Sequence, residues 1–195
     1  MERRSTAYKI VLLGGPHVGK TSIIQRYVSN AFSDSRNITV QAEYAEKRVT
    51  VQGKNALLTI WDTAGQENFK AVAPIYYRNS SAILVVFDIT DRSSFLLAQD
   101  WVKEVATEGA ELALVGNKCD LVGRVQEREV QSVAQDLGVR YYYTSAKSGG
   151  GLEDLFSKVT VQLLAKDSGR DSKSSASPRR VTIKDIPAPR SKGCC

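Results

Sequence analysis

Cysteine and histidine are scarce in this sequence. Its 195 residues include three cysteines and a single histidine, His17. Cys119 lies in mid-chain, and Cys194 and Cys195 are the last two residues, which is not the even spacing of a disulfide-stapled secreted domain. A chain of this length buries a sizeable core without such staples. The sequence therefore excludes a disulfide scaffold and predicts one domain with a short appendage.

Long apolar runs are also lacking. The first residues are polar, and the apolar run at 10–13 is too short for a signal peptide or a membrane span. The composition, 42% hydrophobic and 25% charged, is that of an ordinary globular protein. We therefore expect a protein that is made and kept in the cytosol.

Positive charge is concentrated near the end of the chain. The net charge is +6, and the segment 167–195 holds seven Lys and Arg residues against three Asp residues. Such a tail suggests an anionic partner, either nucleic acid or a membrane leaflet. It contains no aromatic side chain that could stack on bases, which favours the membrane. Because it is rich in Ser, Lys, Arg and Pro and has almost no periodicity, we predict that it is disordered.

Strand-like and helix-like segments alternate before the tail. The predicted strands span residues 8–13, 82–89, 112–115 and 141–143, with a hairpin over 44–61. The predicted helices span residues 21–28, 93–107, 127–137 and 152–165. This alternation predicts an open α/β sheet whose ligands bind beyond the carboxyl ends of the strands.

The residues after the first strand match the pattern G-x-x-x-x-G-K-[ST] over 14–21. Gly14 and Gly19 allow backbone N–H groups to point at phosphate oxygens. Lys20 supplies a positive charge to the β- and γ-phosphates, and Thr21 offers a hydroxyl to Mg²⁺. The predicted phosphate-binding residues are Gly15, His17, Val18, Gly19, Lys20, Thr21 and Ser22.

Two further segments follow later strands and indicate the base. After the strand at 112–115 comes Asn117-Lys118-Cys119-Asp120, and after the strand at 141–143 comes Thr144-Ser145-Ala146-Lys147. The Asp120 carboxylate can accept from two guanine donors, whereas adenine presents an acceptor at N1. We predict that Asn117, Lys118, Asp120, Ser145, Ala146 and Lys147 bind guanine, with the Ala146 N–H directed at its O6.

A third group of residues matches the chemistry of a γ-phosphate sensor. Asp62 can hold magnesium through a water, the Gly65 N–H can reach the γ-phosphate, and Gln66 can orient the attacking water. Thr39, in the polar loop before the hairpin, can bind magnesium only while the γ-phosphate holds that loop closed. The predicted catalytic residue is Gln66, and the predicted metal ligands are Thr21, Thr39 and Asp62.

The motif set and its spacing resemble the Ras superfamily, and several stretches resemble its Rab branch. These stretches are 61–67, 76–78, 87–90 and the Cys194-Cys195 ending. The resemblance implies a three-layer P-loop NTPase G domain over residues 7–166, with a mostly parallel six-stranded sheet, one antiparallel strand and helices on both faces. It also implies a monomeric GDP/GTP switch with Mg²⁺ that hydrolyses GTP slowly in vesicle trafficking.

The resemblance also implies partners and a place in the cell. Exchange factors, activating proteins, a dissociation inhibitor or escort protein, and effectors would operate the switch, and nucleic acid would not. By position, Phe32 matches the aromatic residue that packs on guanine, and Tyr44, Trp61 and Tyr76 match an effector-facing triad. Double geranylgeranylation at Cys194 and Cys195 would give stable attachment to the cytoplasmic face of endomembranes, with a cytosolic inhibitor-bound pool. Residues 40–42 resemble the endosomal Rab subgroup.

Departures from the family pattern leave two other readings open. Pro16 stands in the phosphate loop, Gln41 replaces a common glycine and Asn68 replaces a common arginine. A protein that holds GTP permanently without hydrolysing it would suit Pro16, but Gln66 opposes it. An ATP-dependent kinase or motor would share the phosphate loop, but Asp120 argues against it.

Overall fold

The computed structural model of the chain describes residues 6–33, 43–63 and 72–171, with side chains through residue 168. Its strands are β1 (Thr6–Leu13), β2 (Glu43–Val51), β3 (Lys54–Asp62), β4 (Ala82–Asp88), β5 (Glu111–Asn117) and β6 (Arg140–Tyr143). Its helices are α1 (Lys20–Ser29), α2 (Ala73–Tyr77), α3 (Arg92–Val105), α4 (Glu127–Asp136) and α5 (Leu152–Asp171), with the 3₁₀ turn η2 (Ala106–Glu108) after α3.

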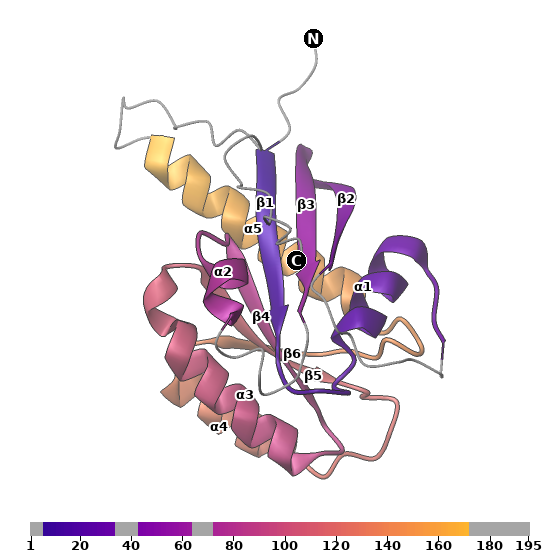
Figure 1. Cartoon of the computed structure of the whole chain (residues 1–195). Coiled ribbons are helices and arrows are strands. Elements are labelled where there is room, and N and C mark those ends of the chain that lie inside the picture. The colour runs from indigo at the N-terminus through magenta and orange to yellow at the C-terminus, as the bar shows by residue number, and fades with distance from the viewer. Residues whose placement is uncertain (1–5, 34–42, 64–71, 172–195) are drawn as a thin grey trace, which may run out of the picture.

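The strands form one sheet in the order β2-β3-β1-β4-β5-β6 (Figure 1). Every neighbouring pair is parallel except β2 and β3, which form the predicted hairpin. Gln52 and Gly53 turn the hairpin with φ of 51° and 72°, the positive values that a tight two-residue turn requires. The predicted α/β class, the six strands and the single antiparallel strand are confirmed.

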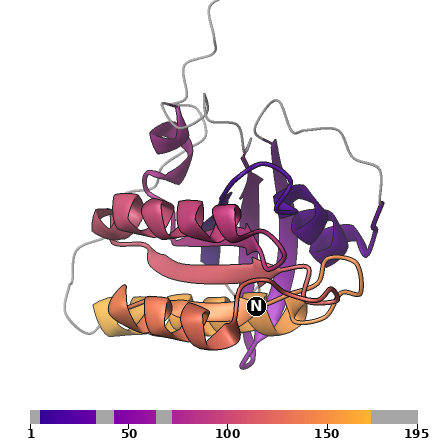
Figure 2. The same cartoon turned by 90° about the horizontal axis from the view of Figure 1, so that it is seen from below.

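Alternate residues of the central strands supply two hydrophobic cores. Ile10 and Leu12 of β1 face one core, and Val11 and Leu13 face the other. The first core packs against α1 and α5, and the second against α2, α3 and α4. Figure 2 turns the view so that helices are seen flanking the sheet. Burial on both faces explains why every residue of β4 before Asp88, its last, is apolar.

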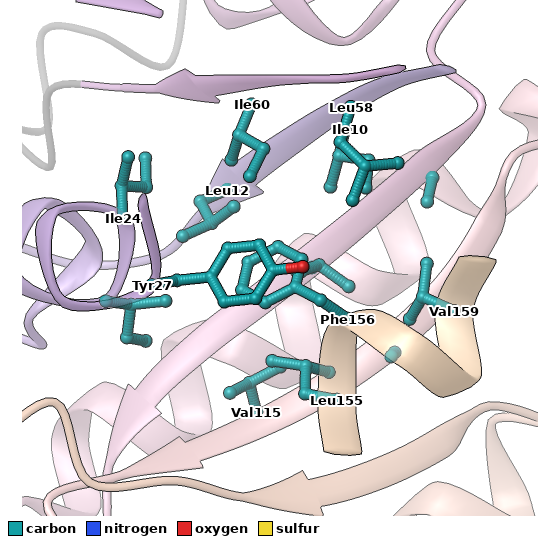
Figure 3. Packing of buried hydrophobic residues seen from close by; sticks show 14 of the residues in the cluster. Ile10, Leu12, Ile24, Tyr27, Leu58, Ile60, Val115, Leu155, Phe156 and Val159 are labelled. Atoms are coloured by element: carbon teal, nitrogen blue, oxygen red, sulfur yellow. The ribbon is translucent and has the colours of Figure 1, made fainter. Parts of the chain in front are cut away.

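An aromatic pair fills the centre of the first core. The rings of Tyr27 on α1 and Phe156 on α5 stack with centroids 3.9 Å apart (Figure 3). Lys47 on β2 lies over the Tyr27 ring at 3.6 Å and donates to the Tyr27 carbonyl oxygen at 2.6 Å. This contact joins the edge strand β2 to the carboxyl-terminal part of α1.

The last helix is longer than its sequence indicates. The pattern predicts an end at residue 165 and disorder from 167, but α5 continues to Asp171. The extra turns are polar and carry no apolar periodicity, so side-chain hydrogen bonds hold them instead. The Tyr8 hydroxyl donates to Asp167 at 2.7 Å, and Lys54 Nζ donates to Ser168 Oγ at 3.2 Å. Within the described ranges no helix has both the length and the apolarity needed to cross a bilayer.

Candidate functional site

The segment between β1 and α1 forms a tight loop held against the neighbouring strands. Gly14 has φ 140°, and a Cβ atom there would lie 2.1 Å from the Val86 carbonyl oxygen. Gly19 has φ 95°, and a Cβ atom there would lie 2.4 Å from Asn117 Nδ2. Both positions need glycine for backbone angle and for space. The chain can therefore bring its backbone closer to a ligand here than side chains would allow.

Lys20 opens α1 and folds back into this loop. Its side chain is buried, and Nζ donates to the carbonyl oxygens of Gly14 at 2.9 Å and Gly15 at 2.7 Å. Burial lowers the pKa of its ammonium group to about 8, while the nearby Asp62 carboxylate acts in the opposite direction. A buried ammonium with only neutral acceptors gains when charged phosphate oxygens replace them.

The other predicted phosphate-binding residues lie around Lys20. Val18 is buried, Ser22 is half-buried, and His17 is exposed beside Pro16 with a left-handed φ of 59°. We call residues 14–22 together with Asp62 the phosphate end of the site. The fold thus brings the predicted loop residues together, and their contact with phosphate stays a prediction.

Thr21 and Asp62 meet where α1 begins and β3 ends. Thr21 Oγ1 donates to Asp62 Oδ2 at 2.6 Å. A hydroxyl oxygen and a carboxylate oxygen side by side are ligands that Mg²⁺ accepts, so these two residues fit the predicted ion. The described residues contain no cluster of three or more His, Cys, Asp and Glu side chains that could hold a metal by themselves. The remaining ligands would have to come from a nucleotide, water or the rest of the chain.

Asn117 connects three separate segments at the end of β5. Its Nδ2 donates to the Val18 carbonyl oxygen at 2.9 Å. Its Oδ1 accepts from Thr144 Oγ1 at 3.2 Å and from the Ala146 N–H at 3.2 Å. Because Asn117, Thr144 and Ala146 are all buried, these hydrogen bonds are protected from water. Asn117 therefore fixes the two predicted guanine-binding segments to the phosphate loop.

Residues 117–120 and 144–147 form what we call the base end of the site. Ser145 Oγ donates to Asp120 Oδ1 at 2.5 Å, which joins the two segments a second time. Lys118 has a left-handed φ of 65°, and its Nζ lies 2.5 Å from Asp88 Oδ2 at the end of β4. Asp88 is buried, and its other oxygen accepts from the N–H and the hydroxyl of Thr90. Lys118 is thus held by a neighbouring strand.

Phe32 and Lys147 border the base end. Phe32 is half-buried against the first core, and Lys147 is exposed. The guanidinium carbon of Arg26 lies 5.7 Å from the centroid of the Phe32 ring, and Arg26 Nε donates to the Ala146 carbonyl oxygen at 2.9 Å. The predicted guanine-binding residues therefore gather at the ends of β5 and β6, next to the end of α1.

The three aromatic residues of the predicted triad form one cluster on the surface. The Tyr44 and Trp61 rings have centroids 5.2 Å apart, and the Trp61 and Tyr76 rings 6.0 Å apart. The Tyr44 side chain is 59% exposed, which excludes simple core packing for that residue. Ile75, beside Tyr76, is 74% exposed. Exposed aromatic and aliphatic groups on adjacent elements are typical of a protein-binding surface.

Several predicted site residues lie outside the described ranges. They are the catalytic candidate Gln66, the phosphate contact Gly65, the magnesium ligand Thr39 and the lipidation sites Cys194 and Cys195. The departures Gln41 and Asn68 also lie outside them. Their roles stay predictions.

Sequence reasoning missed two residues that the structure brings to the base end. Asp88 belongs to the stretch 87–90, which carried the family resemblance but was given no role. Arg26 belongs to no motif and is separated from Ala146 by 120 positions. A charged residue that ends an otherwise apolar strand was a usable signal for Asp88. No sequence signal pointed to Arg26.

Comparison with known proteins identifies relatives along nearly the whole chain. The model of the Ras family matches residues 9–165. Ras-related protein Rab-21 of Dictyostelium discoideum is 44% identical over 168 residues, covering 84% of this chain and 79% of the relative. Ras-related protein Rab-21 of Mus musculus is 42% identical over 206 residues, covering 98% and 93%. Ras-related protein Rab-13 of Bos taurus is 37% identical, covering 91% and 90%.

Proposed function

This chain belongs to the Rab branch of the Ras family of small GTPases, and from that membership we propose which of its residues hold the nucleotide and which one promotes hydrolysis. Like its family, the chain is a GTP hydrolase that works as a GDP/GTP switch in vesicle trafficking. The ATP-dependent kinase or motor is thereby excluded, and so is a protein that only holds GTP.

The nucleotide lies across the carboxyl ends of the parallel strands in this proposal. At the phosphate end, the backbone N–H groups of Gly15 and of residues 17–22, together with the Lys20 ammonium, receive the phosphates. At the base end, Asp120 pairs with the donor edge of guanine, the Ala146 N–H faces O6, and Lys118 and Phe32 lie along the ring. The observation that carries the proposal is Asn117, whose side chain bonds Val18 on one side and Ala146 on the other.

Hydrolysis needs a positioned water and charge neutralisation at the γ-phosphate. Mg²⁺ held by Thr21, Thr39 and Asp62 would supply part of that neutralisation. Gln66 orients the attacking water, and the Gly65 N–H contacts the γ-phosphate. Since Thr39 binds the ion and the Gly65 N–H reaches a phosphate only in the GTP state of this scheme, the loops that contain them change state when the γ-phosphate leaves. Intrinsic turnover for such sites is on the order of 10⁻⁴ to 10⁻² s⁻¹.

The membrane anchor and the compartment are further parts of the proposal. We assign double geranylgeranylation to Cys194 and Cys195, with the basic segment 167–195 attracted to anionic lipid. The working location is the cytoplasmic face of endosomal membranes, with a cytosolic pool bound to a dissociation inhibitor. The partners are an exchange factor, an activating protein and effectors that contact the Tyr44–Trp61–Tyr76 cluster. The chain acts as a monomer.

The nucleotide assignment is tested by identifying what copurifies with the chain. The full-length protein is denatured, and the released small molecules are separated by chromatography and weighed by mass spectrometry. We expect GDP or GTP in about equal molar amount to protein. A chain carrying adenine nucleotide, or none after addition of GDP and Mg²⁺, would contradict the proposal. An Asp120→Ala variant is the matched control, since it should lose guanine and keep its fold.

The catalytic assignment is tested by single-turnover hydrolysis. The chain is loaded with GTP, Mg²⁺ is added, and phosphate release is followed in the natural chain and in Gln66→Leu. The rate should fall at least about tenfold in the variant while GTP affinity stays the same. Equal rates would remove Gln66 from the mechanism but leave the nucleotide site intact.

A further inference from the structure

Arg26 on α1 is bonded to the loop that follows β6. Its Nε donates to the Ala146 carbonyl oxygen at 2.9 Å, and its Nη2 donates to the Lys147 carbonyl oxygen. One guanidinium thus holds two successive carbonyl groups of the base end. Planar guanidinium groups fix geometry better than a lysine ammonium does, because their donors point in set directions.

A second contact keeps the guanidinium in place. The Phe32 ring lies below it, with 5.7 Å between the ring centroid and Arg26 Cζ. Phe32 is itself half-buried against the first core. Arg26 is therefore held between a packed aromatic ring and two carbonyl groups, so its position is determined by the fold.

The two sides of Ala146 are used differently. Its N–H points inward to Asn117 Oδ1 at 3.2 Å, and its carbonyl oxygen points outward to Arg26. Within one residue the directions of the N–H and the carbonyl group are linked through only two backbone dihedrals. Holding the carbonyl group therefore limits where the N–H can point.

We propose that Arg26 is a positioning residue for guanine recognition, which acts by holding the Ala146 N–H at the edge of the base end, where O6 of the base can share it with Asn117 Oδ1. The inference rests on the proposed function, in which that N–H faces O6. It adds a residue from the helix after the phosphate loop to the machinery that reads the base. Phosphate binding and base reading are then coupled through α1.

Helix capping is the competing explanation for the same side chain. Arg26 Nη1 also donates to the carbonyl oxygen of Asn30 at 3.2 Å and to its Oδ1 at 3.3 Å. Asn30 ends α1 in the left-handed conformation. If capping were the role of Arg26, its loss would weaken the helix whatever base was bound. The variant Asn30→Gly removes the side-chain acceptor and keeps the left-handed backbone.

The test compares two nucleotides that differ at O6. Dissociation of GDP and of 6-thio-GDP, which keeps the N1–H and the 2-amino group but carries a weakly accepting sulfur atom in place of O6, is measured from the full-length chain. Arg26→Met retains much of the aliphatic stem, and we expect it to release GDP about tenfold faster. Release of 6-thio-GDP should change by a clearly smaller factor, about twofold or less. Arg26→Lys should restore part of the GDP lifetime, and Asn30→Gly should leave it unchanged.

Three results would overturn the inference: GDP release unchanged in Arg26→Met, both nucleotides released faster by the same factor, or Asn30→Gly matching Arg26→Met. Circular dichroism confirms folding of each variant, and Arg26→Gln, which retains an amide donor, replaces Arg26→Met if that variant does not fold. If the natural chain bound neither GDP nor GTP, the proposed guanine site itself would be wrong. That result comes from the natural chain, before any variant is measured, so it is distinct from a failure of the Arg26 inference.

Discussion

The phosphate end and the base end of the site are built in different ways. At the phosphate end, one contiguous segment supplies a loop, a buried lysine and the start of a helix, and Asp62 alone comes from elsewhere. At the base end, side chains from α1, β4 and β5 and from the segment after β6 hold one another through separate bonds. The first is local backbone geometry, and the second is a network assembled by the tertiary fold.

This difference predicts how each end responds to substitution. Where one ammonium supplies most of the side-chain charge, its removal should cost most of the nucleotide affinity. Where several hydrogen bonds hold the site together, removing any one of them should reduce the nucleotide affinity less. The effects of removing two neighbouring bonds should not be additive.

Gly14→Ala at the phosphate end and Gly151→Ala next to the base end introduce the same clash. An added Cβ atom would lie 2.1 Å from a carbonyl oxygen at either position, Val86 or Tyr143. We expect a loss of about 3 kcal/mol or more in the free energy of unfolding for each. Gly53→Ala is the control, because its φ of 72° is also positive but nothing lies within 4 Å. It should lose about 1 kcal/mol in urea unfolding. A similar loss of stability in all three variants would mean that backbone strain, and not the clash with the carbonyl oxygen, causes the destabilisation.

Lys20→Met tests the concentration of charge at the phosphate end. The variant keeps an apolar side chain of similar length but removes the ammonium, so GDP affinity should fall about 100-fold. Lys9→Met is the matched control. Burial lowers the pKa of Lys9 as well, yet its ammonium lies over the Trp61 ring, away from the loop. GDP affinity is measured by titration calorimetry. An equal loss of affinity in the two variants would contradict a special role for the Lys20 charge.

Asp88→Asn tests the support of Lys118 at the base end. The substitution keeps the shape but removes the charge that faces Lys118 Nζ at 2.5 Å. We expect GDP to dissociate about tenfold faster, since Lys118 is then less well held. Asp91→Asn, three positions later, alters the cap of α3, where the Asp91 side chain accepts from the Ser93 N–H. The rate of GDP release, measured by stopped flow, should be unchanged in Asp91→Asn. An equal increase of that rate in both variants would refute a specific role for Asp88.

Thr144→Val removes one bond from the network at the base end. Thr144 is fully buried, and its hydroxyl donates to Asn117 Oδ1 at 3.2 Å. Stability should fall by about 1 kcal/mol and GDP affinity by a few-fold, because the Ala146 N–H still bonds the same oxygen. Thr50→Val breaks an exposed bond to Asn55 on the hairpin and should change the free energy of unfolding by less than about 0.5 kcal/mol. Loss of all nucleotide binding in Thr144→Val would show that the base end depends on this single hydrogen bond and not on the network.

The same contrast explains what sequence could predict. The phosphate end follows from residues adjacent in sequence, so a short pattern located Lys20 and Thr21 and the strand and helix beside them. Asn117, Asp120 and Ala146 were found because they follow predicted strands, and parallel strands end at one edge. Asp88 and Arg26 act through partners that only folding brings close, such as Ala146 at 120 positions from Arg26. Their partners could not be assigned from spacing.

The predicted end of α5, at residue 165, was wrong for a related reason. Beyond residue 165 its residues are polar, and apolar periodicity is the signal by which a helix is recognised. The additional turns depend on Tyr8 and Lys54, which lie far away in sequence. A pattern confined to one segment therefore underestimates a helix that other segments stabilise.

The hydrogen bond from Tyr8 to Asp167 has a mechanical consequence. Tyr8 belongs to β1, whose amino end lies at the edge of the sheet opposite the carboxyl ends of the parallel strands (Figure 1). The chain leaves α5 at that edge, so tension applied beyond residue 171 is transmitted first to β1 and, through Lys54, to β3. Pulling on that end would have to break both hydrogen bonds before the last turns of α5 could separate from the sheet.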